Sequence, residues 1–537
     1  MEARLFFEFL QVVICNRESL SRELSDNEWQ YIFLLLKKHA LLGVGFTAVE
    51  RLHANGVVCP AQLRLQWYAL VVQIERRNEK LNELCKKVTE QYEHDGLATC
   101  ILKGQGNCLN YPEELRMRRQ CVDIDVWTTL MNDERLRIND YLHTEDRERH
   151  GCPQADYLRE QQLPAIGQQL KEKNIDPLIA QMNTDGCPQA DGGGEQQFTE
   201  IGQQLKEIGP QADGGIAIAV QTGKEEVEYV EYHGRRAVIE YVRMQHRLAG
   251  NNEKPVIRYH HIEAPKMEGT EVEVHFRPCY AHSPLRNWRM QRWFEEHADV
   301  CMKNKTHMGF AVPTASVNVV YQMCHLFSHY FDEGIGLRQL MDYYFALRMW
   351  HNDVMECKDL QSQGMWSEGL GKPVMSKEEV MGVLRSFGMG KFAAAVMFVL
   401  NEVFENEECI LNEECRMKKQ RSAAEGKANE ECSEADDVVE QQLSSIGQQL
   451  KEKCVCEPWM ICEPNEKEGK KLLEEIMKGG NFGQYDTRDA ELKRGGMMKH
   501  GLWKLKRVMR LVRSYPEEAL WEPVFRVWHL LWRGING

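Results

Sequence analysis

The stretch that most restricts how this chain can fold runs from Val122 to Trp127, where apolar and acidic residues alternate. Successive side chains of a strand point to opposite faces, so Asp123 and Asp125 are predicted to project together from one face. The apolar residues predicted on the opposite face are Val122, Ile124 and Val126. Two adjacent carboxylates repel each other unless a cation neutralises them, and Mg²⁺ binds oxygen ligands of this kind. The pattern therefore predicts metal-assisted phosphoryl or nucleotidyl chemistry.

A second pair of predicted strands lies downstream, at Val256–Ala264 and Glu271–Arg277, with a turn at Gly269 between them. In the second of these strands, Glu271, Glu273 and His275 alternate onto one face. An acid from a neighbouring strand would complete a three-carboxylate metal cluster with the aspartate pair. Glu273 is the favoured third acid, and Glu271 is interpreted as a solvated residue at the strand start.

Composition excludes several classes of protein. The chain has 537 residues, enough for two to four domains, and its formal net charge of −14 argues against a general nucleic-acid coat. The eighteen cysteines include no Cys-x-x-Cys pair and follow no secretory leader, so they are expected to be reduced thiols. No apolar run approaches the length of about 18 residues that a spanning helix needs. We expect a cytoplasmic protein.

A thirteen-residue unit, EQQ-x₃-IGQQLKE, recurs at Glu160, Glu195 and Glu440. The spacing of the first two copies could indicate a solenoid, but stacking needs at least three neighbouring units and the third copy lies far downstream. The surrounding Gly, Gln and Glu are typical of weakly ordered sequence. We interpret 140–222 and 418–455 as insertions into an older framework.

Helical spacing of apolar residues before position 95 and after Val317, with strands between them, predicts an α+β protein. The predicted regions are a helical N-terminal region (1–95), a core in two parts (96–139 and 223–315), a repeat-containing insertion (140–222), a helical region completing the site (316–417), a second insertion (418–455) and a helical basic C-terminal region (456–537).

Several short motifs occur in a characteristic order. They are Leu102-Lys103-Gly104, Tyr111-Pro112, Arg119, the Asp-x-Asp segment ending at Trp127, Glu273-Val274-His275, the helical segment His325–His329, and Leu337-Arg338 followed by Asp342. Together they resemble the bacterial uncharacterised nucleotidyltransferase family of the polymerase-β superfamily. With the insertions set aside, the resemblance extends from about Trp29 to Phe345.

The resemblance implies a polymerase-β-like core, a small mixed sheet with helices on it, which holds one or two Mg²⁺ ions. Asp123, Asp125 and Glu273 would be the metal ligands, and Glu273 could also act as the base for the acceptor. The implied reaction transfers a nucleoside monophosphate from an NTP, expected to be ATP, to an acceptor hydroxyl of unknown identity.

The resemblance also implies nucleotide-binding residues. Gly104 would let the backbone approach the triphosphate closely, and Lys103 and Arg119 would neutralise phosphate charge, Arg119 through its bidentate fork. Arg338 either reaches the nucleotide or forms a helix-surface ion pair with Asp342, and the two readings are evenly balanced. The residues expected around the metal ligands are His275, His325 and Asp342.

Histidines offer an alternative metal site. His325 and His329 are four residues apart on one predicted helix face, a spacing that suits zinc, and the histidines at 260, 261 and 275 could join them. No cysteine or glutamate nearby completes a known zinc spacing. We therefore interpret these histidines as hydrogen-bonded residues of the core or of the surroundings of the site.

Two departures from the family pattern favour an alternative, a catalytically degenerate binding or regulatory module. Val122 replaces the glycine that usually precedes the first aspartate, and the first insertion separates the second and third acids. A sugar-nucleotide glycosyltransferase also uses Asp-x-Asp, but repeated strand–helix units should then precede the doublet. The hundred residues before it are mostly helical here, so we rank that alternative lower.

The C-terminal region combines a basic segment, Lys493–Arg513, with three tryptophans further on, Trp521, Trp528 and Trp532. A basic amphipathic helix with tryptophans can lie on an anionic membrane, which makes 493–533 a candidate for peripheral membrane contact. Most amphipathic helices instead pack their apolar stripe on their own protein, and we favour that interpretation here.

Overall fold

The computed structural model of the protein describes residues 3–131, 215–221, 227–250, 254–362, 374–405, 458–488, 491 and 497–536. All three copies of the thirteen-residue unit lie outside these ranges. So does the second predicted insertion, and so does the first except for its last residues, 215–221. The predictions made for these segments therefore remain predictions.

A mixed four-stranded sheet lies at the centre of the described chain. Its strands are β1 (Leu97–Ile101), β2 (Ile124–Leu130), β5 (His261–Glu263) and β6 (Val272–His275). The strand order is β1-β2-β6-β5. β2 and β6 run parallel, whereas the two outer pairs are antiparallel. The protein is therefore α+β with a small mixed sheet, as predicted.

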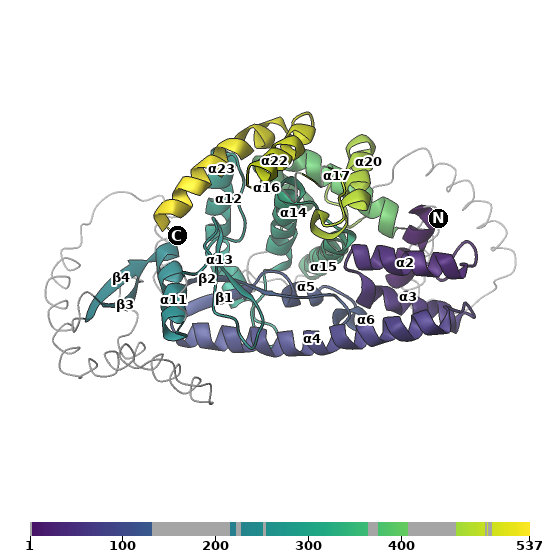
Figure 1. The fold of residues 1–537 in the computed structure, drawn as a ribbon, viewed down its shortest axis with the longest axis horizontal. Coiled ribbons are helices and arrows are strands. Elements are labelled where there is room, and N and C mark those ends of the chain that lie inside the picture. The colour runs from purple at the N-terminus through teal and green to yellow at the C-terminus, as the bar shows by residue number, and fades with distance from the viewer. Residues whose placement is uncertain are drawn as a thin grey trace.

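One face of the sheet is apolar and packs on α4 (Ala61–His94) and α11 (Gly234–Leu248), which Figure 1 shows beside the strands. Ile124 and Val126 of β2 share a buried cluster with Val88 of α4 and Tyr241 of α11. The prediction that Val122 belongs to this face is wrong. Its side chain is 65% exposed, because the strand begins only at Ile124.

Four helices form the N-terminal region: α1 (Ala3–Val13), α2 (Asp26–Lys38), α3 (Leu42–Ala54) and α4. Ser25 is the N-cap of α2, and its amide donates to the Glu28 carboxylate at 3.0 Å. The rings of Phe9, Phe33 and Phe46 surround the buried Trp67 of α4, which ties these helices together.

The connection from β1 to β2 contains two short helices, α5 (Gln105–Cys108) and α6 (Glu113–Arg116). Between Leu97 and Trp127 the chain therefore forms a strand, two short helices and the start of a second strand. The two later strands are shorter than predicted. Only His261–Glu263 and Val272–His275 form regular strands, and an isolated bridge joins Ile257 to Ile262.

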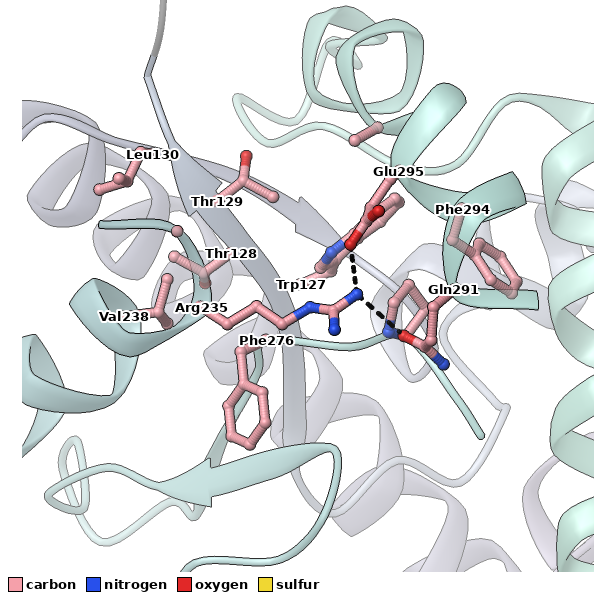
Figure 2. A pocket seen from close by; sticks show the side chains of 13 residues that line it. Trp127, Thr128, Thr129, Leu130, Arg235, Val238, Phe276, Gln291, Phe294 and Glu295 are labelled. Atoms are coloured by element: carbon pink, nitrogen blue, oxygen red, sulfur yellow. Dashed lines mark hydrogen bonds and ion pairs between the residues drawn. The ribbon is translucent and has the colours of Figure 1, made fainter. Parts of the chain in front are cut away.

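An unpredicted antiparallel hairpin, β3 (Gly215–Gln221) and β4 (Val227–His233), leads directly into α11. In Figure 1 the hairpin extends beyond α11 on the left. Figure 2 shows Arg235, at the start of α11, reaching Gln291 and Glu295 of α12 (Pro284–Glu296) across a pocket beside Trp127. These contacts connect α11 to α12 beside the C-terminal half of β2.

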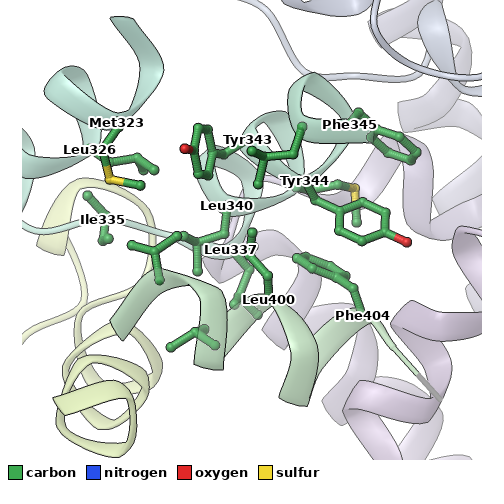
Figure 3. Close-up of a cluster of buried hydrophobic side chains, with 14 of the residues drawn as sticks. Met323, Leu326, Ile335, Leu337, Leu340, Tyr343, Tyr344, Phe345, Leu400 and Phe404 are labelled. Carbon is green, nitrogen blue, oxygen red and sulfur yellow. The ribbon is translucent and has the colours of Figure 1, made fainter. Parts of the chain in front are cut away.

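The other face of the sheet meets a helical layer made of α12, α13 (Ala298–Lys303), α14 (Ala315–Asp332), α15 (Leu337–Ser362), α16 (Lys377–Ser386) and α17 (Gly390–Phe404). Figure 3 shows the core of this layer, where Leu326 of α14, Leu340 and Tyr344 of α15, and Leu400 and Phe404 of α17 pack together. The longer helices of this layer, α14, α15 and α17, are well buried, as the helical pattern after Val317 predicted.

The C-terminal region contains α20 (Glu466–Gly479), the 3₁₀ helix η1 (Asn481–Gly483), α22 (Met497–Leu511) and α23 (Pro516–Asn536). α22 buries Trp503 and Val508, and its Arg507 donates to the backbone carbonyls of Phe331 and Tyr330 at 3.0 and 2.5 Å. The basic helix therefore packs on the protein, in agreement with the favoured interpretation.

α23 behaves differently, because much of its apolar surface is in solvent. The exposed residues include Leu520, Trp521, Val524, Val527, Trp528, Leu530 and Leu531. A helix that crosses a bilayer must be both long and continuously apolar, and within the described ranges no helix meets both conditions.

Candidate active site

Asp125 and Glu273 are direct partners in the parallel register of β2 and β6, and Trp127 and His275 form the next pair on the same face. The alternation of both strands sends these side chains away from the apolar face that packs on α4 and α11. One ligand atom each from Asp125, Glu273 and His275 lies within 4.8 Å of the others. The structure therefore brings together two of the three predicted acids.

Asp125 is fully buried, and its Oδ1 atom lies 2.9 Å from Lys103 Nζ and 3.1 Å from His275 Nε2. Burial alone would raise the pKa of Asp125, but the charge of Lys103 and the hydrogen bond with His275 hold that pKa well below its usual range. Its other oxygen, Oδ2, has no hydrogen-bond partner among the described residues. An ionised, buried carboxylate with a free oxygen is suited to bind a cation.

Asp123 precedes β2 by one residue and is only partly buried. The negative charge of Asp125, followed by burial, raises the pKa of Asp123, whereas Lys103 opposes that shift. The carboxylates at 123 and 125 therefore act on each other, as expected for a pair that shares a cation.

Glu273 lies close to two histidines. Its Oε2 atom is 3.5 Å from His261 Nδ1 and 3.6 Å from His275 Nε2. Burial opposes ionisation, but the hydrogen bond with His275 is among the interactions that lower the pKa of Glu273. Glu271 has a different environment, because it is exposed and pairs with Lys266 at 3.1 Å. The interpretation of Glu271 as a solvated residue agrees with this position.

Lys103 and Gly104 form the turn after β1. Gly104 has φ +60° and ψ −114°, a backbone conformation that residues with a side chain rarely adopt, and a Cβ there would lie 3.3 Å from the Asp123 carbonyl oxygen. This turn brings the Lys103 ammonium to the acids. Burial would lower the pKa of Lys103, but the charges of Asp125 and Asp123 raise it, so the ammonium is retained.

Arg119 occupies a position that its predicted role did not anticipate. Its guanidinium is 3% exposed and forms a bidentate pair with Asp342, at 2.6 and 2.7 Å, and the Tyr111 hydroxyl donates to the same carboxylate at 2.7 Å. The fork that was expected to bind phosphate is occupied in this arrangement. Asp342 therefore pairs with Arg119 rather than with Arg338, one helical turn before it.

Arg338 is the second arginine that was expected to bind phosphate, and its guanidinium is only partly hydrogen-bonded. Its guanidinium donates to the Gln120 carbonyl at 3.1 Å and lies over the Phe482 ring at 5.7 Å, while its Nε has no hydrogen-bond partner among the described residues. The charge of Arg338 is among those that oppose the raised pKa of Asp123. From α15, Arg338 therefore acts electrostatically on Asp123.

α14 covers the acid-bearing face with Tyr321 and His325, whose rings stack at 5.9 Å. Burial, followed by the charge of His329, lowers the pKa of His325 well below its usual range, so this imidazole is neutral. His325 is thus near the acids, but it is not among the groups whose ligand atoms lie within 4.8 Å of one another in the described chain.

Two residues near the acids had no predicted role in the site. Cys108 and Cys121 place their sulfur atoms 3.6 Å apart, and Arg119 contacts the Cys121 sulfur at 2.8 Å. The thiols are buried, and the cysteine pattern alone showed no pairing because the two positions are thirteen residues apart. The fold of the connection between β1 and β2, which includes α5 and α6, brings the two thiols together.

Three pockets of the described chain do not include the acids in their lining, and the largest of the three, about 710 Å³, is lined by α4, the end of α11 and the loop between β5 and β6. The pocket in Figure 2, with a free volume of about 40 Å³, is lined by Trp127 and neighbouring residues of β2, together with parts of α11 and α12. A second pocket of about 550 Å³ lies between α12 and α23, where Trp288, Trp521 and Trp528 line it. An aromatic pocket of this size could accommodate a small organic molecule.

Comparison with known proteins adds one finding. Residues 198–364 match the model of a protein family described as uncharacterised nucleotidyltransferase. The matched segment contains Glu273, His275 and Arg338, whereas Asp123 and Asp125 precede it. No curated protein and no solved structure matches the chain.

Proposed function

Because residues 198–364 match the model of an uncharacterised nucleotidyltransferase family, we propose that the chain transfers a nucleoside monophosphate from an NTP to an acceptor hydroxyl. ATP is the first candidate for the NTP, and the proposed cofactor is Mg²⁺. The observation that carries the proposal is the register of β2 and β6, which sets Asp125 beside Glu273, with Asp123 two residues away.

The donor set fits a divalent ion. The free Oδ2 atom of buried Asp125 and the neighbouring carboxylate of Glu273 offer oxygen ligands. Asp123 and Asp125 repel each other, and a bound cation would reduce that repulsion. Asp123, Asp125 and Glu273 would hold the ion. When bound, Mg²⁺ would polarise phosphoryl oxygens and stabilise the charge that develops on the attacking and leaving oxygens.

The remaining residues of the site would bind and orient the substrates. Lys103 and Arg338 supply positive charge for the phosphates, and the turn at Gly104 lets the backbone approach them closely. Glu273, whose lowered pKa keeps it ionised at neutral pH, can accept a proton from the acceptor hydroxyl. Arg119 and Asp342 would act as positioning residues, because their buried pair connects α15 to the segment before β2.

The structure bears on the rival functions through particular features. Val122 is largely in solvent, so its β-branched side chain is not a plug between the carboxylates, and this favours an active site over a degenerate one. From Ala3 onward, where the structure is described, four helices and no strand–helix repeats precede β1. A glycosyltransferase with a nucleotide-binding domain before its Asp-x-Asp segment therefore remains the weaker alternative.

The test is Asp125→Asn compared with the wild type and with Glu271→Gln, which changes an exposed acid just before β6. We expect Asp125→Asn to abolish the Mg²⁺-dependent release of pyrophosphate from NTPs, because the amide loses the charge that attracts the ion. Glu271→Gln should keep the wild-type rate. Circular dichroism would verify that both variants are folded.

Two results would contradict the proposal. Equal pyrophosphate release by the wild type and by Asp125→Asn would show that the Asp125 carboxylate is not needed for turnover. Calorimetry that detects no Mg²⁺-dependent binding of a non-hydrolysable ATP analogue to the wild type would favour the degenerate module instead.

A further inference from the structure

Three histidines converge beside the acids. His261 of β5 is the direct cross-strand partner of His275 of β6, and His260 precedes β5 by one residue. Direct partners on an antiparallel pair have Cβ atoms about 5 Å apart, so their rings meet on one face. The ring centroids lie 4.4 Å apart for His260 and His261, 5.2 Å for His260 and His275, and 5.1 Å for His261 and His275.

The three rings also bring their nitrogen atoms together. One ligand nitrogen from each histidine lies within 4.8 Å of the other two. His261 is 4% exposed and His275 is 2% exposed, whereas His260 is partly buried. Convergent imidazole nitrogens in a nearly dry environment, with one partly accessible ring, form a preorganised set of donors.

Hydrogen bonding within the described part of the protein leaves one nitrogen of each ring without a partner. A single hydrogen bond joins two of the rings, between His261 Nδ1 and His260 Nε2 at 3.0 Å. Among the described residues, His260 Nδ1, His261 Nε2 and His275 Nδ1 have no partner. The described chain therefore satisfies only one nitrogen of each ring, and a buried polar atom left without a partner costs about 1–3 kcal/mol.

The charges around the cluster favour a cation as that species. Glu273 Oε2 lies 3.5 Å from His261 Nδ1 and 3.6 Å from His275 Nε2, and Asp125 Oδ1 lies 3.1 Å from His275 Nε2. The imidazoles supply lone pairs and the adjacent carboxylates supply negative charge. An anion would be repelled by these carboxylates, and a neutral apolar ligand would gain from neither the lone pairs nor the negative charge.

We propose that His260, His261 and His275 bind one divalent transition-metal ion of the zinc class, adjacent to the carboxylate cluster. Imidazole nitrogens favour zinc, cobalt and related ions, whereas Mg²⁺ favours oxygen ligands. Three histidines that leave a further coordination position open are a known arrangement for zinc. The site goes beyond the proposed nucleotide transfer and does not depend on it.

The experiment titrates chelator-treated, untagged full-length protein with Co²⁺ and Zn²⁺ in the absence of nucleotide. We expect one ion per chain, detected by Co²⁺ visible absorption and by calorimetry. His261→Gln should weaken binding at least roughly tenfold, because perturbing the surroundings of a metal ligand already costs that much. His329→Gln changes a histidine outside the group, and it should bind like the wild type.

A second measurement keeps the proposal testable if His261→Gln does not fold. X-ray absorption of the zinc-loaded wild type should show imidazole nitrogen ligands. Oxygen ligands alone, absence of Co²⁺ binding by the wild type, or equal affinities of the wild type and folded His261→Gln would each overturn the proposal.

The two proposals can fail separately. Asp123→Asn should lose Mg²⁺-dependent nucleotide binding and retain the Co²⁺ spectrum, because Asp123 is outside the histidine group. A wild type that binds Co²⁺ through imidazoles but binds no NTP would refute nucleotide transfer alone.

Discussion

At the scale of single residues, a buried ion pair holds the site together. Arg119 and Asp342 come from segments more than two hundred residues apart, and both are less than 5% exposed. Burial would raise the pKa of Asp342, but the guanidinium of Arg119 lowers it. Removing one member of such a pair leaves the other charge buried and unpaired, which is more costly than losing an exposed pair.

Asp342→Asn should therefore lower the free energy of unfolding by about 3 kcal/mol. The matched control is Glu114→Gln, which breaks the accessible pair between Arg51 and Glu114 and should cost less than about 1 kcal/mol. Urea unfolding followed by tryptophan fluorescence measures both changes. Equal losses in the two variants would show that the buried pair stabilises the fold no more than the accessible pair does.

At the scale of elements, the turn between β1 and α5 sets the position of Lys103. Gly104 adopts a left-handed φ there, which most residues avoid. The turn is short, and Leu102 at its start donates its amide to the Asp125 carbonyl at 3.0 Å. A change in this turn therefore acts directly on the distance between the Lys103 ammonium and the acids.

Gly104→Ala should destabilise the protein by about 1–3 kcal/mol, because alanine at this φ is strained, and it should weaken NTP binding. Gly382→Ala offers a contrast, since that glycine lies in α16 with open space around its Cβ position. Alanine there should stabilise the helix by roughly 0.5–1 kcal/mol. Thermal unfolding would compare the stability of the two variants, and calorimetry would compare their nucleotide binding. If Gly104→Ala stabilised the protein, the positive φ described for Gly104 would be wrong.

At the scale of the whole molecule, His39 joins the N-terminal helices to α15. It is fully buried after α2, and its Nδ1 accepts a hydrogen bond from the Leu337 amide at 3.3 Å. Burial, together with the charge of Lys38, lowers the pKa of His39 to about 3. The folded protein therefore keeps this imidazole neutral at pH values where the unfolded chain takes up a proton.

This difference makes stability depend on pH. Below pH 6.5, the pKa of His39 in the unfolded chain, the unfolded state binds a proton that the folded state does not bind. The free energy of unfolding therefore falls as the pH falls. His39 alone should cost about 2 kcal/mol between pH 7 and pH 5. His39→Gln keeps a hydrogen-bonding side chain and should reduce the pH slope of the urea midpoint. An unchanged slope would show that His39 titrates alike in both states.

Much of the fold was predictable because its signals are local. The start of α2 depends on Ser25 and Glu28, three residues apart, and α4 follows from the spacing of its own apolar residues. The hairpin of β3 and β4 was missed because β3 lies inside the predicted insertion 140–222, whose composition dominated the interpretation. Val122 was misplaced for a related reason, since alternation does not mark the residue at which a strand begins.

Sequence alone indicated most of the helices and the approximate positions of the strands of the central sheet, although it missed the β3–β4 hairpin. It also singled out Asp125 and Glu273 as acids on one strand face each, because alternation is a property of neighbouring residues. Only the tertiary structure decided that these strands pair in parallel, that Asp342 binds Arg119, and that His261 faces His275. Strand order, register and charge pairing join residues far apart in the chain. They depend on how whole elements pack, and local periodicity does not encode that.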